Sequence, residues 1–166
     1  MTDRAEQTER PVLFLDVDGT LLPLGGTRSP AAPVQDTPNP LLARLDPAHG
    51  PRLLALPCEL MWATTWMADA NEVISPLLGL PRLPVVELPE TPQGEAVALH
   101  HKTRPLVDTA AGRSFIWVDD EITDVDRAWV AAHHPGRALL HRVDAAVGLT
   151  EGDFAVLEAW LWKGPR

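Results

Sequence analysis

The sequence predicts a layered α/β domain with helices and a mainly parallel sheet of five strands. Two observations predict this fold. Short apolar runs alternate with helical patterns along the chain, and three of those runs end in polar residues. Ligands of parallel sheets bind beyond the carboxyl ends of the strands. We therefore expect Asp16, Thr64 and the pair Asp119-Asp120, which stand at such ends, to meet in one site.

The N-terminal part of the chain begins with a polar segment, residues 1–10, which we expect to be disordered, before a single domain over residues 11–166. Prolines and the pair Gly25-Gly26 predict a loop over the active site, because they suit neither a helix nor a central strand. The expected order is strand 12–15, loop 21–40, a short extended piece at 41–46, helix 48–56, strand 59–64 and helix 69–78.

The C-terminal part repeats the alternation of strands and helices. Turn residues end the helices, with Gly79 after one and Gly112 after the next. Thr150 and Asp153 have the spacing of a capping box and predict the start of the last helix. The expected order is strand 83–88, helix 103–111, strand 114–118, helix 123–134, strand 137–143 and the last helix from Thr150.

Composition limits the possible functions. The chain has 166 residues, is 45% hydrophobic and carries a formal net charge of −9. Nucleic acid is a possible partner, but this charge gives it no support. One cysteine rules out a disulfide framework and fits a reducing compartment. No apolar stretch is long enough to span a membrane and no signal peptide is recognisable, so we expect a cytoplasmic protein without membrane contact, of unknown oligomeric state.

The most informative stretch is Val-Leu-Phe-Leu-Asp-Val-Asp-Gly-Thr, residues 12–20. Residues two apart on an extended chain share a face, so the carboxylates of Asp16 and Asp18 can point into one pocket. Gly19 then allows a sharp turn. Two close carboxylates repel each other unless a cation or a shared proton compensates them, which predicts a divalent metal. A plain Asp-Gly turn would explain Asp18 but not Asp16.

These nine residues resemble the first motif of the haloacid dehalogenase-like (HAD) phosphohydrolases, Asp-x-Asp-Gly-Thr after an apolar strand. The resemblance implies a three-layer, Rossmann-like fold. By position it makes Asp16 the nucleophile and Asp18 the general acid and base, with Gly19 and Thr20 supporting them. A carboxylate can act as a covalent nucleophile at neutral pH, and a second carboxyl can protonate the leaving oxygen.

The resemblance extends to a second and a third motif. Thr64, the first hydroxyl after the second strand, would bind the transferring phosphoryl group, with Thr65 as the alternative. A purely structural role is also open, in which the Thr caps the helix that follows. Lys102, just before a helix, would neutralise phosphoryl charge. Of the six tryptophans, Trp66 is the best placed to line the pocket and to stack on a substrate ring or base. Core packing is expected for four others, in apolar strands or on apolar helix faces: Trp62, Trp117, Trp129 and Trp160.

The fourth motif is an apolar strand that ends in Asp119-Asp120, with Asp124 a few residues later. Oxygen ligands favour Mg²⁺. Asp120 occupies the ligand position in the resemblance, with Asp119 as its competitor, and Asp124 would orient a ligand or bind the metal through water. The expected metal ligands are therefore Asp16, Asp18, Asp119 and Asp120.

Together the motifs predict a Mg²⁺-dependent phosphohydrolase with a minimal cap, acting through an aspartyl-phosphate on a phosphomonoester of unknown identity. The segments around Thr64 and Asp119 are similar to those of small HAD domains associated with RNA repair. A polynucleotide-end or phosphoprotein phosphatase is one alternative, because an uncapped site would admit a macromolecular phosphate. A non-catalytic, metal-binding interaction module is the other.

Overall fold

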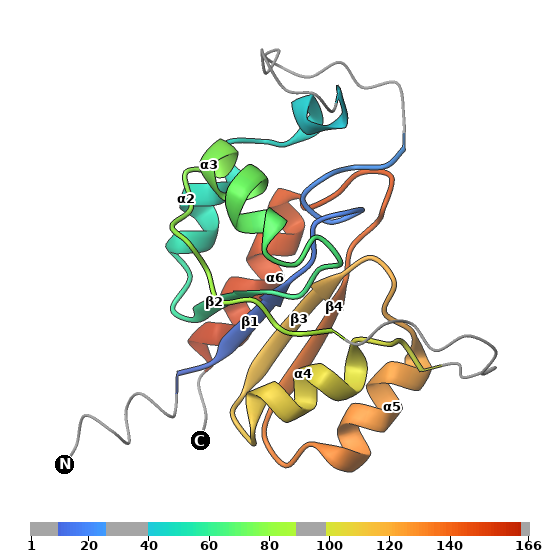
Figure 1. The fold of residues 1–166 in the computed structure, drawn as a ribbon. Coiled ribbons are helices and arrows are strands. Elements are labelled where there is room, and N and C mark those ends of the chain that lie inside the picture. The colour runs from blue at the N-terminus through green and yellow to red at the C-terminus, as the bar shows by residue number, and fades with distance from the viewer. Residues whose placement is uncertain (1–9, 26–39, 89–98, 164–166) are drawn as a thin grey trace, which may run out of the picture.

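The computed structural model describes residues 10–25, 40–88 and 99–163. Within these residues the centre of the fold is a parallel sheet in the order β2-β1-β3-β4 (Figure 1). Its strands are β1 (Val12–Leu15), β2 (Glu59–Trp62), β3 (Phe115–Asp119) and β4 (Ala138–Arg142). The α/β class and the parallel sheet predicted from the sequence are confirmed, but the described sheet has four strands and not five.

The strand expected at 83–88 is the one that does not form. Only a parallel bridge joins Val85 to Trp62, through bonds from Trp62 N to Pro84 O (2.9 Å) and from Val86 N to Trp62 O (2.9 Å). Pro84 has no N–H to donate. The side chain of Asn71 binds both backbone groups of Leu83, at 2.7 and 2.8 Å. The pairing along β2 therefore stops after one step.

The expected helices are present with slightly shorter bounds. They are α2 (His49–Leu54), α3 (Ser75–Leu78), α4 (Thr103–Ala110), α5 (Asp124–His133) and α6 (Glu151–Trp162). A π-helical segment, η2 (Ala70–Ile74), leads directly into α3. Thr150 and Asp153 form the predicted capping box of α6. The extended piece expected at 41–46 is wrong: residues Pro40–Arg44 form a 3₁₀ helix, η1, which buries Leu42.

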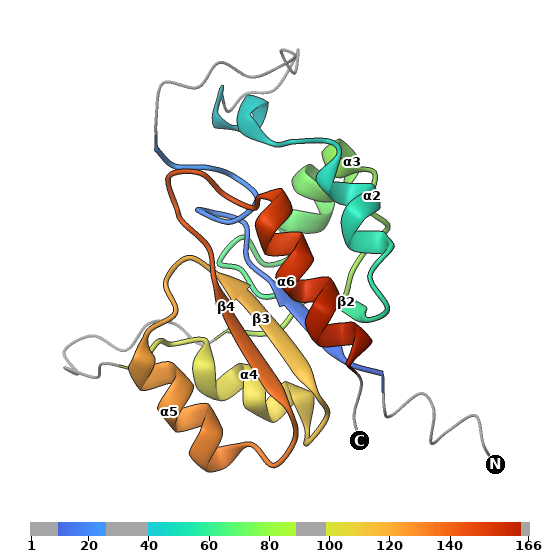
Figure 2. The same ribbon diagram turned by 180° about the vertical axis from the view of Figure 1, so that it is seen from behind.

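The helices cover both faces of the sheet, so the predicted three layers are confirmed. Helices α4 and α5 lie on one face, and α2, α3 and α6 lie on the other (Figures 1 and 2). Alternate residues of β1 pack against the helices on opposite faces of the sheet, because successive side chains of a strand point to opposite faces. Leu13 and Leu15 pack in the core with α6, whereas Val12 and Phe14 pack in the core with α4.

Parts of the predicted organisation lie outside the described residues, namely residues 1–9 of the polar lead and 26–39 of the loop expected over the site. The minimal cap and the extent of the single domain stay predictions. None of the helices in the described ranges has the length and apolar character that crossing a bilayer requires. The expected cytoplasmic location also stays a prediction.

The parallel register determines which residues meet at the carboxyl edge of the sheet. Leu15 of β1 pairs with Val118 of β3, so the next residues along, Asp16 and Asp119, lie side by side. A bond from Asp16 N to Val118 O (3.2 Å) continues the pairing past the end of β1. On the other side, Ala63 N donates to Leu15 O at 2.8 Å, so Thr64 also follows at this edge.

Candidate active site

Three carboxylates gather at the carboxyl edge of the sheet. Asp16 follows β1, Asp119 ends β3 and Asp120 comes next. Each offers an oxygen that lies within 4.8 Å of the others. Asp16 and Asp119 are buried, at 5% and 0% exposure, whereas Asp120 is partly exposed. The structure therefore brings together three of the four predicted metal ligands.

The ammonium group of Lys102 lies between two of these carboxylates. The residue immediately precedes α4 and is 2% exposed. Its Nζ donates to Asp16 Oδ1 at 2.8 Å and to Asp119 Oδ2 at 2.7 Å. Burial alone would lower the pKa of Lys102, but the two carboxylates outweigh burial and raise it. Lys102 is thus held as a cation at the centre of the acidic cluster.

Lys102 does not neutralise the cluster. Burial raises the pKa of Asp16 well above its ordinary value, and the negative charge of Asp119 adds to this, although Lys102 opposes both effects. Burial and Asp119 likewise raise the pKa of Asp120. Three carboxylates face one ammonium, so the ionised site carries an excess of negative charge. That excess is the electrostatic condition for binding a cation.

The two adjacent aspartates of the fourth motif have different surroundings. Asp119 Oδ2 accepts from Lys102 and from Trp117 Nε1 (3.1 Å), and its Oδ1 accepts from Glu121 N at 3.0 Å. Both oxygens of Asp119 are therefore bonded. Asp120 Oδ1 is buried and has no hydrogen-bond partner among the described residues. An unpaired buried carboxylate oxygen fits a metal ligand, because burial without a partner is costly.

Gly19 and Thr20 support the cluster from the turn after β1. Gly19 has a φ of +81°, in the left-handed region that favours glycine. A β-carbon at this position would lie 2.5 Å from both Cγ and Oδ2 of Asp120. Thr20 Oγ1 donates to Asp16 Oδ2 at 3.3 Å. The first motif thus supplies Asp16 and also Gly19, whose lack of a side chain lets Asp120 pack against the turn.

Asp18 has a separate setting from the other predicted metal ligands. Its side chain is half-buried and is not part of the three-carboxylate cluster. Its Oδ2 accepts a hydrogen bond from Trp66 Nε1 at 3.1 Å. The structure therefore separates the two carboxylates of the first motif, with Asp16 on Lys102 and Asp18 on Trp66.

The two threonines of the second motif also differ. Thr64 is fully buried and Thr65 is exposed. Thr64 Oγ1 accepts from Trp66 N at 3.2 Å, the kind of local bond by which a Thr closes a turn. This bond leaves the Thr64 hydroxyl proton available to another acceptor. The predicted contacts of Thr64 and Thr65 with a phosphoryl group stay predictions.

Residues 12–154 match the protein-family model described as the HAD domain in Swiss Army Knife RNA repair proteins. The chain belongs to this family. The match covers the turn after β1, Lys102 and the acidic pair at the end of β3. No curated protein and no solved structure gives a significant match. Membership indicates hydrolase chemistry, and the acidic cluster is compatible with a metal site.

Asp124 of this HAD domain does not lie with the other carboxylates. Its side chain is 99% exposed and pairs with Arg127, 3.0 Å away. It begins helix α5, where a carboxylate stabilises the helix dipole. The structure therefore places Asp124 at the N-terminus of α5 and outside the cluster of three carboxylates.

Asp126 is a residue of the HAD domain that the motif comparison missed. It is fully buried and its Oδ2 accepts from the backbone and hydroxyl of Thr123, both at 2.9 Å. Its Oδ1 accepts from His100 N (2.8 Å) and Thr103 Oγ1 (2.9 Å), which flank Lys102. Asp126 thus ties the start of α5 to the segment that carries the central cation. The Thr-x-x-Asp spacing of a capping box could have revealed it.

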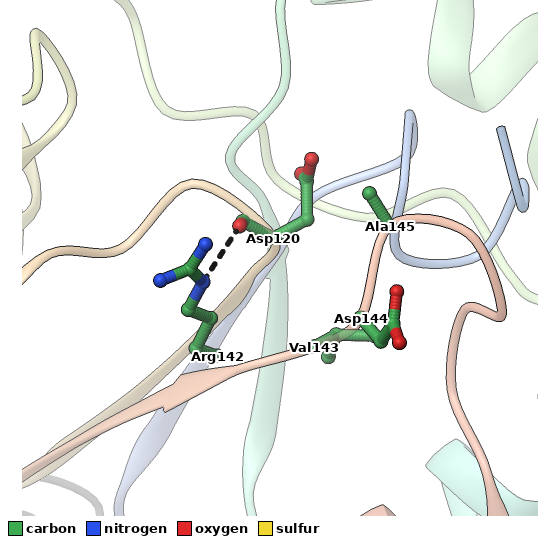
Figure 3. A pocket seen from close by; sticks show the side chains of 5 residues that line it. All are labelled: Asp120, Arg142, Val143, Asp144 and Ala145. Carbon is green, nitrogen blue, oxygen red and sulfur yellow. Dashed lines mark hydrogen bonds between the residues drawn. The ribbon is translucent and has the colours of Figure 1, made fainter. Parts of the chain in front are cut away.

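A cavity of about 440 Å³ opens beside Asp120 (Figure 3). Arg142 and Val143 at the end of β4 line it together with Asp144 and Ala145. Arg142 Nε donates to the backbone oxygen of Asp120 at 3.3 Å. We did not single out Arg142 from the sequence. Its place at the carboxyl end of a strand is the signal that could have identified it.

Proposed function

We propose that this HAD domain is a Mg²⁺-dependent phosphomonoester hydrolase that acts through an aspartyl-phosphate on Asp16. The observation that carries the proposal is the buried Asp16, which Lys102 holds beside two further carboxylates. A carboxylate nucleophile must stand next to positive charge if it is to approach an anionic phosphate. The family match independently supports hydrolase chemistry.

Asp16, Asp119 and Asp120 are the residues that would hold the metal. All three offer hard oxygen ligands, and the unpaired Oδ1 of Asp120 makes it the first candidate for a direct bond. Asp18 lies outside the cluster, so we leave it out of this set. Bound Mg²⁺ would stabilise negative charge on the phosphoryl oxygens and offset the repulsion among the carboxylates.

In the first half of the reaction, a carboxylate oxygen of Asp16 attacks phosphorus. The Asp16 O–P bond forms while the bond to the leaving oxygen breaks, and Asp18 transfers its proton to that oxygen. Lys102 offsets the charge that Asp16 and the phosphoryl group bring together. In this proposal the buried Thr64 hydroxyl donates to a phosphoryl oxygen.

In the second half, water hydrolyses the aspartyl-phosphate. Asp18, now ionised, takes a proton from the attacking water, and the new P–O bond replaces the bond to Asp16. Inorganic phosphate leaves, Asp16 is again a free carboxylate, and Asp18 has regained its proton. The separate settings of Asp16 and Asp18 support these two distinct roles.

A phosphate at the end of a polynucleotide is the substrate class that we favour over a phosphoprotein. The family is described by its occurrence in RNA repair proteins, and this description is the specific observation in favour of nucleic acid. The net charge of −9 gives no support to it. A non-catalytic interaction module would need the metal cluster but has no use for the nucleophile and proton donor together.

The test uses purified protein with an aryl phosphate, with and without Mg²⁺. We expect hydrolysis that requires Mg²⁺ and is lost in Asp16→Asn. In Asp18→Asn, which keeps the nucleophile, a trapped phosphoenzyme should be detectable by mass spectrometry. Full activity in EDTA, or phosphate on a residue other than Asp16, would contradict the mechanism. A panel of nucleotides, sugar phosphates, phosphopeptides and 3′- or 5′-phosphorylated oligonucleotides identifies the substrate.

A further inference from the structure

Trp66 reaches from the loop after β2 to the second carboxylate of the first motif. Its Nε1 donates to Asp18 Oδ2 at 3.1 Å, across a separation of 48 residues. The indole is half-buried and packs against the hydrophobic core on the side of α3 and α6. Trp66 is therefore anchored in the fold at one end and bonded to Asp18 at the other.

The backbone of the loop holds Trp66 in this orientation. Trp66 N donates to Thr64 Oγ1 at 3.2 Å, and Trp66 O accepts from Asp69 N at 3.0 Å. The next residue, Met67, has a φ of +52°, a conformation that residues other than glycine adopt rarely. Such backbone persists where the surrounding contacts determine it. The turn therefore fixes the backbone of Trp66, and its side chain contacts Asp18 from that fixed position.

The chemistry of indole limits the state of the carboxyl group that it contacts. An indole N–H donates a hydrogen bond and cannot accept one. Asp18 Oδ2 must therefore present a lone pair to Trp66. When Asp18 carries a proton, that proton must be on Oδ1, or the contact with Trp66 is lost.

We infer that Trp66 is a positioning residue for Asp18: it orients the carboxyl group and directs the transferable proton to Oδ1. The inference rests on the proposed function, in which Asp18 protonates the leaving oxygen. In this role Trp66 affects the step that needs a proton donor and leaves attack by Asp16 intact. Stacking of the indole on a substrate ring, the role expected from the sequence, is not required.

The kinetic test compares Trp66→Phe with the wild type on two phosphate esters, using Trp160→Phe as the control for loss of an indole elsewhere. General acid catalysis contributes most to a leaving group of high pKa. Because kcat/KM reports only the steps up to formation of the phosphoenzyme, we expect kcat/KM on an alkyl phosphate to fall about tenfold or more. On an aryl phosphate of low leaving-group pKa, kcat/KM should change less than about threefold. Equal losses on both esters, or no loss on either, would overturn the inference.

A second measurement does not depend on activity. The six tryptophans of the chain should give six indole N–H signals in a ¹⁵N-labelled sample, and Trp66→Phe assigns one of them. Asp18→Ala should move that signal and speed its exchange with solvent, whereas Asp144→Ala should leave it in place. A signal that does not respond to Asp18→Ala would overturn the contact.

The two measurements separate this inference from the proposed function. A wild-type protein without phosphatase activity would overturn the proposed function, and the proton-positioning role with it, while the indole signal still decides whether Trp66 contacts Asp18. An active wild type whose Trp66→Phe variant shows no leaving-group dependence would overturn only the inference.

Discussion

A β-carbon on Gly19 would lie 2.5 Å from the carboxyl carbon of Asp120. The turn of the first motif and the acidic pair of the fourth motif are thus packed against each other without room for a methyl group. Asp120 also carries Oδ1, the buried oxygen that has no hydrogen-bond partner among the described residues. The small size of Gly19 therefore affects the position of a proposed metal ligand.

The first prediction is that Gly19→Ala weakens Mg²⁺ binding. Gly79→Ala is a matched control, because Gly79 also has a positive φ, of +71°, but no atom of the described residues lies within 4 Å of the position of its added β-carbon. Both substitutions should cost about 1–2 kcal/mol of unfolding free energy through backbone strain. Only Gly19→Ala should displace Asp120 and lower the Mg²⁺ affinity measured by calorimetry. Equal affinity in the two variants would show that the close approach is unimportant for the metal.

The second prediction concerns Lys102 as a structural cation. Lys102→Met removes the ammonium from between Asp16 and Asp119, and breaking a buried ion pair by removing one partner costs about 3–5 kcal/mol. Urea unfolding in EDTA should show this loss, and Mg²⁺ should recover part of it by supplying another cation.

The exposed Lys163 provides the control, because Lys163→Met removes a cation from the surface at the end of α6. Lys163→Met should unfold like the wild type with or without Mg²⁺. If Lys102→Met is as stable as Lys163→Met in EDTA, the ammonium of Lys102 does not stabilise the buried carboxylates of Asp16 and Asp119. The structural role proposed for Lys102 would then be wrong.

The third prediction separates Asp126 from Asp124. Asp126→Asn replaces an acceptor by a donor in front of N–H and O–H groups, and an unsatisfied buried group costs about 1–3 kcal/mol. The segment around Lys102 should loosen, so kcat/KM should fall together with stability. Asp124→Asn changes an exposed carboxylate, so it should preserve kcat/KM and cost less than about 1 kcal/mol of stability through the helix dipole. Loss of Mg²⁺ affinity in Asp124→Asn would restore the role suggested by the resemblance.

These residues show what could be predicted from the sequence. Asp16 and Asp119 could be placed in one site because apolar runs that end in Asp become neighbouring parallel strands, and the register then brings their ends together. Lys102 could be named only through the resemblance, since no local pattern says that a lysine before a helix is buried. Its burial depends on the two carboxylates that it meets.

The failure of the strand predicted at 83–88 depends on contacts that no local pattern contains. Residues 83–88 have the apolar pattern of a strand, but Asn71 takes both backbone groups of Leu83 and Pro84 lacks a donor. Asp124 and Asp126 both lie in the first turn of α5, and the phase of the helix decides which one faces inward. The capping-box spacing identifies Asp126, as it did Asp153 in α6.

The fourth prediction assigns different roles to the adjacent aspartates. Asp120→Asn should abolish most of the Mg²⁺ affinity while the protein without metal stays folded. Within the described residues, no ammonium group contacts Asp120 and its Oδ1 has no hydrogen-bond partner. Asp119→Asn should instead destabilise the protein without metal, since it disturbs the bonds from Lys102 and Trp117. Calorimetry with Mg²⁺ and urea unfolding in EDTA measure the two effects. The reverse pattern would make Asp119 the principal ligand.

The pH dependence of the folding stability of Asp120→Asn adds an independent check. Burial and the charge of Asp119 raise the pKa of Asp120 in the folded protein above its ordinary value of 3.8. The unfolded chain therefore loses this proton first, and the ionised group lowers folding stability as the pH rises from about 3.8 through the folded pKa. Asn cannot ionise, so Asp120→Asn in EDTA should gain stability relative to the wild type over that rise and keep the gain at neutral pH. If the difference in stability between Asp120→Asn and the wild type does not change with pH, the ionised form of Asp120 is not destabilised by burial and by Asp119 in the metal-free site.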